Sequence, residues 1–172
     1  MLRSKLLSLT LFALGGLAIP TAHAEKPLKE QIVGTWIYVS STGKNADGSS
    51  FERPPLQGAV TYTADGHFHF IATRPDLPKY ASGDARKPTP EEAMAVASGA
   101  VAYTGTYTVD EANKTINATV KAATFRHLME EPQRRVISAI SDTEMTFINP
   151  RTPSGQSLEI RWKRDPAVES SK

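Results

Sequence analysis

Eight short segments with the pattern of β-strands, separated by turn residues, constrain this chain more than any other feature of its sequence. In each segment apolar residues alternate with polar ones, or run together, over the usual length of a strand. The clearest turn is Ala64-Asp65-Gly66, because Asp-Gly supplies the positive φ angles that a tight hairpin needs. The predicted strands cover residues 32–40, 57–63, 67–72, 101–109, 114–123, 133–140, 144–148 and 157–163.

Most of these segments are joined by short turns, so consecutive strands are expected to pair as antiparallel neighbours. Eight such strands can close into a barrel, which removes exposed edges and leaves room for side chains or one small ligand. The predicted fold class is all-β, an eight-stranded antiparallel barrel with one short helix insert. This single domain covers residues 25–165, and residues 166–172 are predicted to be a flexible polar tail.

The two longest connections, residues 41–55 and 73–88, are rich in Gly, Pro and polar residues and are predicted to be loops. The one predicted helix follows the second of them. Thr89-Pro90-Glu91-Glu92 has the pattern of a capping box, and Gly99 is a C-terminal stop. A helix this short is not stable alone in water, so it must pack on the barrel. It is a lid over the mouth or, as we prefer, a plug that completes the core.

The first residues have the pattern of a secretory signal peptide. Arg3 and Lys5 precede an apolar run at 6–19, and Ala22-His23-Ala24 matches a cleavage site. The apolar run is shorter than the roughly 18–20 residues of a membrane span. We therefore expect residues 1–24 to be removed and the product to be exported, periplasmic or secreted, and soluble, with no membrane span after cleavage.

Charge and cysteine content exclude several classes of protein. Without residues 1–24 the chain has 18 basic and 18 acidic residues, so no net charge favours nucleic acid or an acidic membrane surface as partner. The chain has no cysteine, which excludes disulfides and a lipid anchor at the cleavage site. The oligomeric state does not follow from the sequence.

With these elements in place, the chain resembles the bacterial and fungal lipocalin-like domain family, relatives of lipocalins among the calycin barrels. The resemblance implies an eight-stranded barrel with a helix insert and specifies no activity. The motifs that carry it follow one another along nearly all of residues 25–172: Val33-Gly34-Thr35-Trp36, Val39-Ser40, Gly58, Tyr62, Asp65-Gly66, Arg74-Pro75, Thr89-Pro90-Glu91-Glu92, Ala102-Tyr103, Gly105-Thr106-Tyr107 and Trp162-Lys163-Arg164.

The resemblance also implies two local features. Family members often carry two histidines where this chain has Ala118 and Thr119, so an activity that depends on those histidines is not expected. In true lipocalins a basic residue of the last strand packs over the tryptophan of the first. Here Arg161 and Arg164 are both candidates for that contact with Trp36, which makes these residues and Gly34 structural.

The predicted ligand-binding residues are aromatic side chains on the faces assigned to the interior, with arginines near the mouth. Core packing, with hydroxyls bound to backbone, is the alternative for the tyrosines. A structural pair with Asp76, Asp84, Glu91 or Glu92 is the alternative for the first arginine, and on the sixth strand alternation does not separate Arg135 from Arg134. The set is Tyr62, Phe68, Phe70, Arg74, Tyr103, Tyr107 and Arg135.

Catalytic and metal chemistry have little support. His67 and His69 share a strand face, but a zinc-type site needs three or four ligands, and both histidines fit the outer, wetted face. The chain has no Gly-x-Ser-x-Gly elbow and no Gly-rich phosphate loop. We therefore expect no metal site, no cofactor and no catalytic residue.

These observations favour a protein that binds a small hydrophobic or amphipathic molecule inside the barrel. Two alternatives remain open from the sequence. One is a cyclase or isomerase on the same barrel, which requires a titratable group with a shifted pKa in the pocket. The other is a solid barrel with a structural or interaction role.

Overall fold

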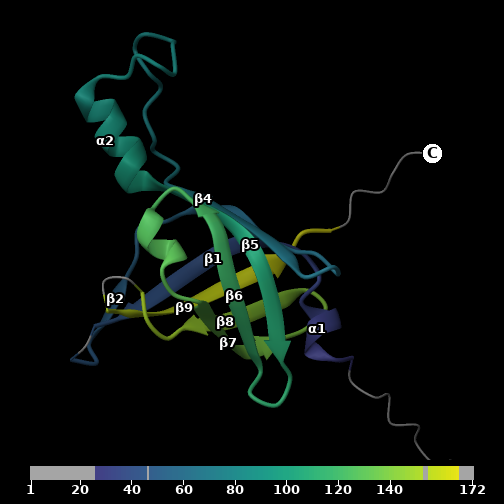
Figure 1. Cartoon of the computed structure of the whole chain (residues 1–172). Coiled ribbons are helices and arrows are strands. Elements are labelled where there is room, and N and C mark those ends of the chain that lie inside the picture. The colour runs from purple at the N-terminus through teal and green to yellow at the C-terminus, as the bar shows by residue number, and fades with distance from the viewer. Residues whose placement is uncertain (1–25, 46, 153–154, 167–172) are drawn as a thin grey trace, which may run out of the picture.

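The computed structural model describes residues 26–45, 47–152 and 155–166 (Figure 1). The predicted signal peptide and nearly all of the predicted tail lie outside these residues. The strands are β1 (Gly34–Lys44), β2 (Ser50–Glu52), β3 (Gln57–Tyr62), β4 (His67–Thr73), β5 (Ala100–Asp110), β6 (Thr115–Ala123), β7 (Gln133–Ile140), β8 (Glu144–Asn149) and β9 (Ser157–Arg164). The helices are α1 (Leu28–Gln31), α2 (Pro90–Gly99) and the 3-10 helix η1 (Arg126–Met129).

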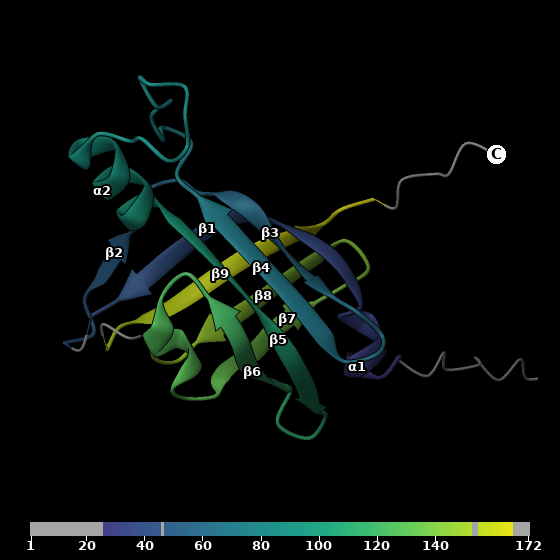
Figure 2. The ribbon, with the colours of Figure 1, turned by 45° about the horizontal axis from the view of Figure 1, so that its top comes forward.

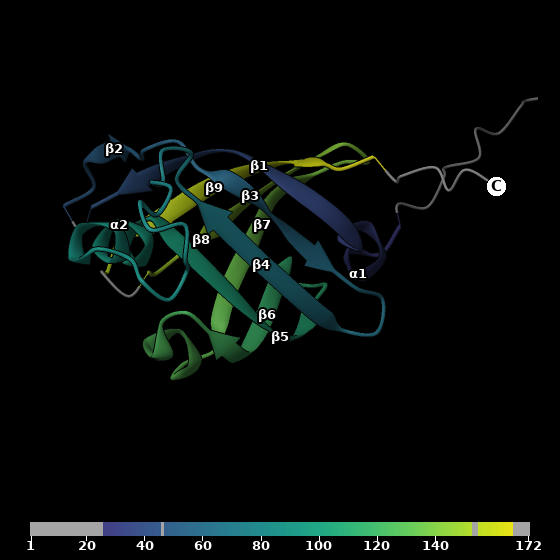
Figure 3. The same cartoon turned by 90° about the horizontal axis from the view of Figure 1, so that it is seen from above.

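The sheet closes into an antiparallel barrel, which confirms the predicted fold class. Strands β3 to β9 pair in chain order, and β1 pairs with β3 on one side and with β9 on the other. Eight strands therefore form the barrel, while β2 is a short addition to the end of β1. Figures 2 and 3 show the tilted strands surrounding a common interior. None of the described helices has the length and apolar content of a membrane span.

Strand β1 differs from its predicted range at both ends. It continues to Lys44, through residues expected to be a loop, because Ser40 to Lys44 pair with β9 beyond a bulge. Backbone pairing on both sides thus outweighs the weak strand preference of Gly and Ser. At the other end, Ile32 is the C-cap residue of α1. Strand β1 begins two residues later at Gly34, whose φ of 124° is unfavourable for other residues.

The predicted helix is confirmed, but its predicted docking as a plug is wrong. The side chain of Thr89 accepts a hydrogen bond from the backbone N–H of Glu92. The side chain of Glu92 in turn accepts one from the backbone N–H of Thr89, as the capping box requires. Figure 1 shows α2 standing away from the barrel, and Gly99 is its only buried residue among those described. Met94 is 69% exposed. Three alanines and no apolar stripe leave this helix without a face to bury.

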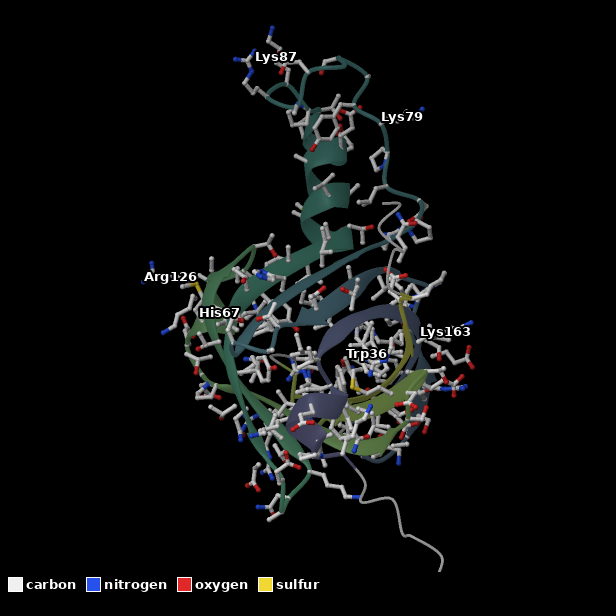
Figure 4. The ribbon with its side chains drawn as sticks, turned by 90° about the vertical axis from the view of Figure 1, so that its right-hand side faces the viewer. Trp36, His67, Lys79, Lys87, Arg126 and Lys163 are labelled. Atoms are coloured by element: carbon white, nitrogen blue, oxygen red, sulfur yellow. The ribbon has the colours of Figure 1, made fainter. Side chains whose placement is uncertain are left out.

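Helix α2 belongs to an excursion of residues 74–99 that leaves the barrel after β4 and returns into β5. The backbone N–H of Arg74 donates to the carbonyl of Gly99 over 2.7 Å, so the two ends meet at the rim. In Figure 4 Lys79 and Lys87 mark the far part of this excursion, whereas Trp36 lies within the barrel. The excursion therefore borders the open end of the barrel without covering it.

Candidate ligand-binding site

The interior of the barrel is packed at one end and hollow at the other. The packed half holds large buried side chains, among them Trp36, Tyr62, Phe68, Ile116 and Met145. Towards the opposite end lies a cavity of about 440 Å³. Its apolar lining includes Phe70, Tyr103, Phe125, Leu128, Phe147, Leu158 and Ile160.

Helix α1 and Arg164 close the packed end. The indole N–H of Trp36 donates to the carbonyl of Ile32 over 2.8 Å, and the guanidinium of Arg164 lies 4.0 Å from the Trp36 ring centroid. Arg164 also donates to the carbonyls of Gln31, Val33 and Asp142. Of the two arginines expected over Trp36, the structure therefore selects Arg164, and the side chain of Arg161 is exposed.

Gly34 leaves the space that Arg164 occupies. A Cβ atom at this glycine would lie 2.8 Å from Nη1 of Arg164. The motif of Gly34 and Trp36 near the start of β1 thus serves the closed end of the barrel. Sequence reasoning placed both residues in a structural role, and these contacts agree with that role.

Three of the seven predicted ligand-binding residues lie in the packed half and do not line the cavity. They are Tyr62, Phe68 and Tyr107. The hydroxyl of Tyr107 donates to the carbonyl of Thr63 over 2.8 Å, which is the core-packing alternative. Burial raises the pKa of Tyr62 above its ordinary value, with the nearby charge of Arg135 acting in the opposite direction. Alternation assigned these side chains to the interior correctly but could not give their depth along the barrel axis.

The other four predicted residues, Phe70, Arg74, Tyr103 and Arg135, line the cavity. The rings of Phe70 and Tyr103 stack with centroids 4.6 Å apart and form one wall. Beneath them Trp162 contacts Phe70 and Phe147, with centroids 6.2 and 5.6 Å away. Its Nε1 is the one side-chain nitrogen or oxygen of the described residues that is fully shielded from solvent and has no hydrogen-bond partner.

Arg74 has the structural partner that was the alternative reading of its sequence position. Its Nε donates to Oδ1 of Asp76 over 2.9 Å, and its Nη2 contacts Oδ2 of the same carboxylate. This hydrogen-bonded pair lowers the pKa of Asp76 and raises that of Arg74. At the rim the side chain of Asp76 is largely exposed and that of Arg74 partly exposed. The charge of Arg74 is already compensated there by Asp76.

Arg135 has a different environment. It is only 8% exposed, whereas Arg134 is on the outside, which settles the choice between the two. Its Nη1 donates to the carbonyl of Arg134 over 2.8 Å, and its Nη2 donates to the hydroxyl of Tyr103 over 3.3 Å. The guanidinium carbon lies 5.8 Å from the ring centroid of Phe147. Within the described residues no carboxylate forms an ion pair with it.

The wall beside Arg135 is partly helical, which sequence reasoning missed. Strand β6 pairs with β7 only from Thr115 to Ala118. Beyond that point η1, in light green beside β6 in Figure 2, contributes Leu128, with Phe125 just before it. An outer groove of about 550 Å³ shares His127, Gln133 and Asn149 with the cavity. The only signal for η1 was a pair of apolar residues at 125 and 128 in a segment expected to be a connection.

The family comparison agrees with this architecture. The model of the lipocalin-like domain family matches residues 33–164. This chain belongs to the lipocalin-like domain family. No protein with a curated description matches the sequence of this lipocalin-like protein.

Solved structures similar to the lipocalin-like protein are β-barrels of low sequence identity. A complex of bovine odorant binding protein with a selenium-containing odorant has a TM-score of 0.41 and 16% identity, over 87% of this chain and 80% of that chain. A de novo designed fluorescence-activating β-barrel has a TM-score of 0.39 and 11% identity, over 82% of this chain and all of the designed chain.

His67 and His69 of this lipocalin-like protein lie on the outer face of the barrel, whereas His127 lines the cavity. His67 is exposed 3.3 Å from Asp65, and Nδ1 of His69 is 2.9 Å from the hydroxyl of Thr104. This is the outer-face placement that the sequence left open. The part of the chain that the structure describes has no group of three or more potential metal ligands. At the positions of the family histidine pair, Ala118 is buried and Thr119 exposed.

Proposed function

We propose that this lipocalin-like protein binds one small, largely apolar molecule in the cavity at the open end of the barrel. The observation that supports this is a cavity of about 440 Å³ with mainly aromatic and aliphatic walls. Ligand pockets commonly have roughly 300–1,000 Å³ and such walls, with a few polar groups that orient the ligand. A solid barrel does not fit the hollow half of the interior.

The cyclase or isomerase alternative lacks a specific observation in its favour. No Asp or Glu is among the described residues that line the cavity. Acid–base chemistry on a bound molecule would therefore have no carboxylate to use there.

We propose further that the protein works after export, periplasmic or secreted, as residues 25–165 freed from the signal peptide 1–24.

The proposal is tested with N-phenyl-1-naphthylamine, a neutral probe whose fluorescence rises in apolar surroundings. Val101 lines the cavity, whereas Ile71 is 55% exposed on the outer face. Val101→Trp fills the cavity, and Ile71→Trp introduces the same side chain outside as a control. We expect Val101→Trp to weaken probe binding at least about tenfold, or about 1.4 kcal/mol, and Ile71→Trp to leave it unchanged.

Thermal unfolding of both variants shows that each is folded before binding is compared. Equal probe affinity in the wild type and both folded variants would place the probe on the outer surface. In that case the cavity would not be a binding site and the proposal would fail.

A further inference from the structure

We infer that the cavity takes an organic anion, a small carboxylate with an apolar body, and that Arg135 holds its carboxylate group. This inference deepens the proposed function and rests on it. It follows from the charge of the cavity lining, from the free donors of Arg135 and from the walls around that side chain.

The cavity lining has basic groups without acidic ones. Among the described lining residues are Arg53, Arg74, Arg135 and His127, and no Asp or Glu is present. Asp76 compensates Arg74, and Arg53 is exposed to solvent. Arg135 alone combines burial, a position inside the barrel and the lack of an acidic partner in the described chain. An arginine side chain remains charged in proteins, so this positive charge is present in the empty barrel.

A buried charge without a partner is unfavourable, because the folded protein loses hydration of that charge and gains no ion pair. A protein that kept Arg135 only for stability would do better with an apolar residue of similar size. Arg164 shows the opposite arrangement, since three backbone carbonyls accept from it. The interior position of Arg135 therefore points to a partner that arrives from outside.

The hydrogen-bonding groups around Arg135 leave donors for such a partner. Its two hydrogen bonds to described residues, to the carbonyl of Arg134 and to the hydroxyl of Tyr103, do not use all guanidinium N–H groups. The Tyr103 hydroxyl accepts a hydrogen bond from Arg135, and its own hydrogen has no acceptor among the described residues. Asn149 is buried at the cavity, and its side-chain amide makes no hydrogen bond to a described residue. Ile148 pairs with Val136, which brings Asn149 next to Arg135 across the ladder.

The walls suit the remainder of the molecule. The stacked rings of Phe70 and Tyr103 lie on one side, and Phe147 lies beneath the guanidinium. A planar carboxylate can accept two parallel hydrogen bonds from a guanidinium, whereas a neutral group gains much less from the same contact. The geometry therefore favours a carboxylate at Arg135 with its apolar body between the aromatic rings.

The experiment compares 2-naphthoate with 2-naphthamide, its neutral counterpart of the same shape. Each displaces N-phenyl-1-naphthylamine from the wild type and from Arg135→Met, Arg135→Lys and Arg134→Met. Arg134 is the matched control, because it is adjacent on β7 and exposed. We expect the wild type and Arg134→Met to bind naphthoate about 10- to 100-fold more tightly than naphthamide, as charged hydrogen bonds imply.

In Arg135→Met that preference should disappear, while binding of naphthamide and of the neutral probe changes less than about threefold. Arg135→Lys keeps the charge without the planar fork and should restore part of the preference. If Arg135→Met binds naphthoate as the wild type does, or the wild type shows no preference, the inference is wrong although the cavity still binds the probe. If the wild type does not bind the probe at all, the proposed function itself is rejected. Arg135→Lys decides the question alone if Arg135→Met does not fold.

Discussion

At the scale of single residues, two arginines with similar sequence surroundings have opposite roles. Arg164 has its donors taken up by backbone carbonyls and its plane over Trp36. Arg135 has donors to spare inside a cavity. Alternation along a strand named the pairs Arg134 and Arg135, and Arg161 and Arg164, without a choice within either pair. On β7 the choice requires the bulge between Ile137 and Ala139, which changes the facing of side chains without a sequence signal. Strand β9 alternates regularly, so Arg164 lies on the same side as Leu158 and Trp162.

The closed end of the barrel depends on Arg164. We expect Arg164→Met to lower the free energy of unfolding by about 2–4 kcal/mol, because it removes three hydrogen bonds from a charged donor and leaves carbonyls without partners. Arg161→Met, on the exposed face of the same strand, should change it by less than about 0.5 kcal/mol. Urea unfolding of both variants makes the comparison, and equal losses would contradict the role given to Arg164.

Tyr62 makes stability depend on pH in the alkaline range. Because burial raises the pKa of Tyr62 in the folded protein, the unfolded chain releases this proton first as the pH rises. Stability is therefore complete below the ordinary tyrosine pKa of about 10 and decreases above it. In Tyr62→Phe the urea midpoint should fall less from neutral to alkaline pH than it does in the wild type. In Tyr80→Phe, a control on the excursion, it should fall as much as in the wild type. An unchanged alkaline decrease in Tyr62→Phe would contradict this assignment.

At the scale of elements, the capping box predicted α2 correctly because its signals are local. Its docking could not be predicted, since that depends on an apolar face that alanine-rich residues do not provide. The same distinction applies to α1 and η1. Each is a single turn stabilised by its tertiary contacts, through Leu28 and Leu128 respectively, and neither carries a strong local signal.

The excursion of residues 74–99 should be dispensable for the barrel. Its ends are joined by the hydrogen bond from Arg74 to Gly99, and α2 buries little against the strands. Replacing residues 75–98 with Asn-Gly gives the antiparallel strands β4 and β5 a short hairpin turn. We expect the unfolding free energy to stay within about 1 kcal/mol of the full chain. A variant that no longer unfolds cooperatively would show that the excursion supports the core.

At the scale of the whole molecule, the number, order and closure of the strands could be predicted, because short turns between alternating segments leave few topologies. The division of the interior into a packed and a hollow half could not. That division depends on the stagger of the strands and on α1 and η1 at the two ends. It decides which aromatic residues lie at the cavity: Phe70 and Tyr103 line its wall, while Tyr62 and Phe68 lie below it.

The pairing of β1 with β9 has a consequence for the order of events during folding. Trp36 and Arg164 are register partners, so the ring closes only when nearly the last residue of the domain is present. Synthesis begins at the N-terminus, so β1 and β8 remain open edges until β9 has been made. Open edges can pair with other chains. Contacts this distant in sequence form slowly, typically in milliseconds to seconds. Loss of the last strand would therefore leave an aggregation-prone open sheet and no smaller stable barrel.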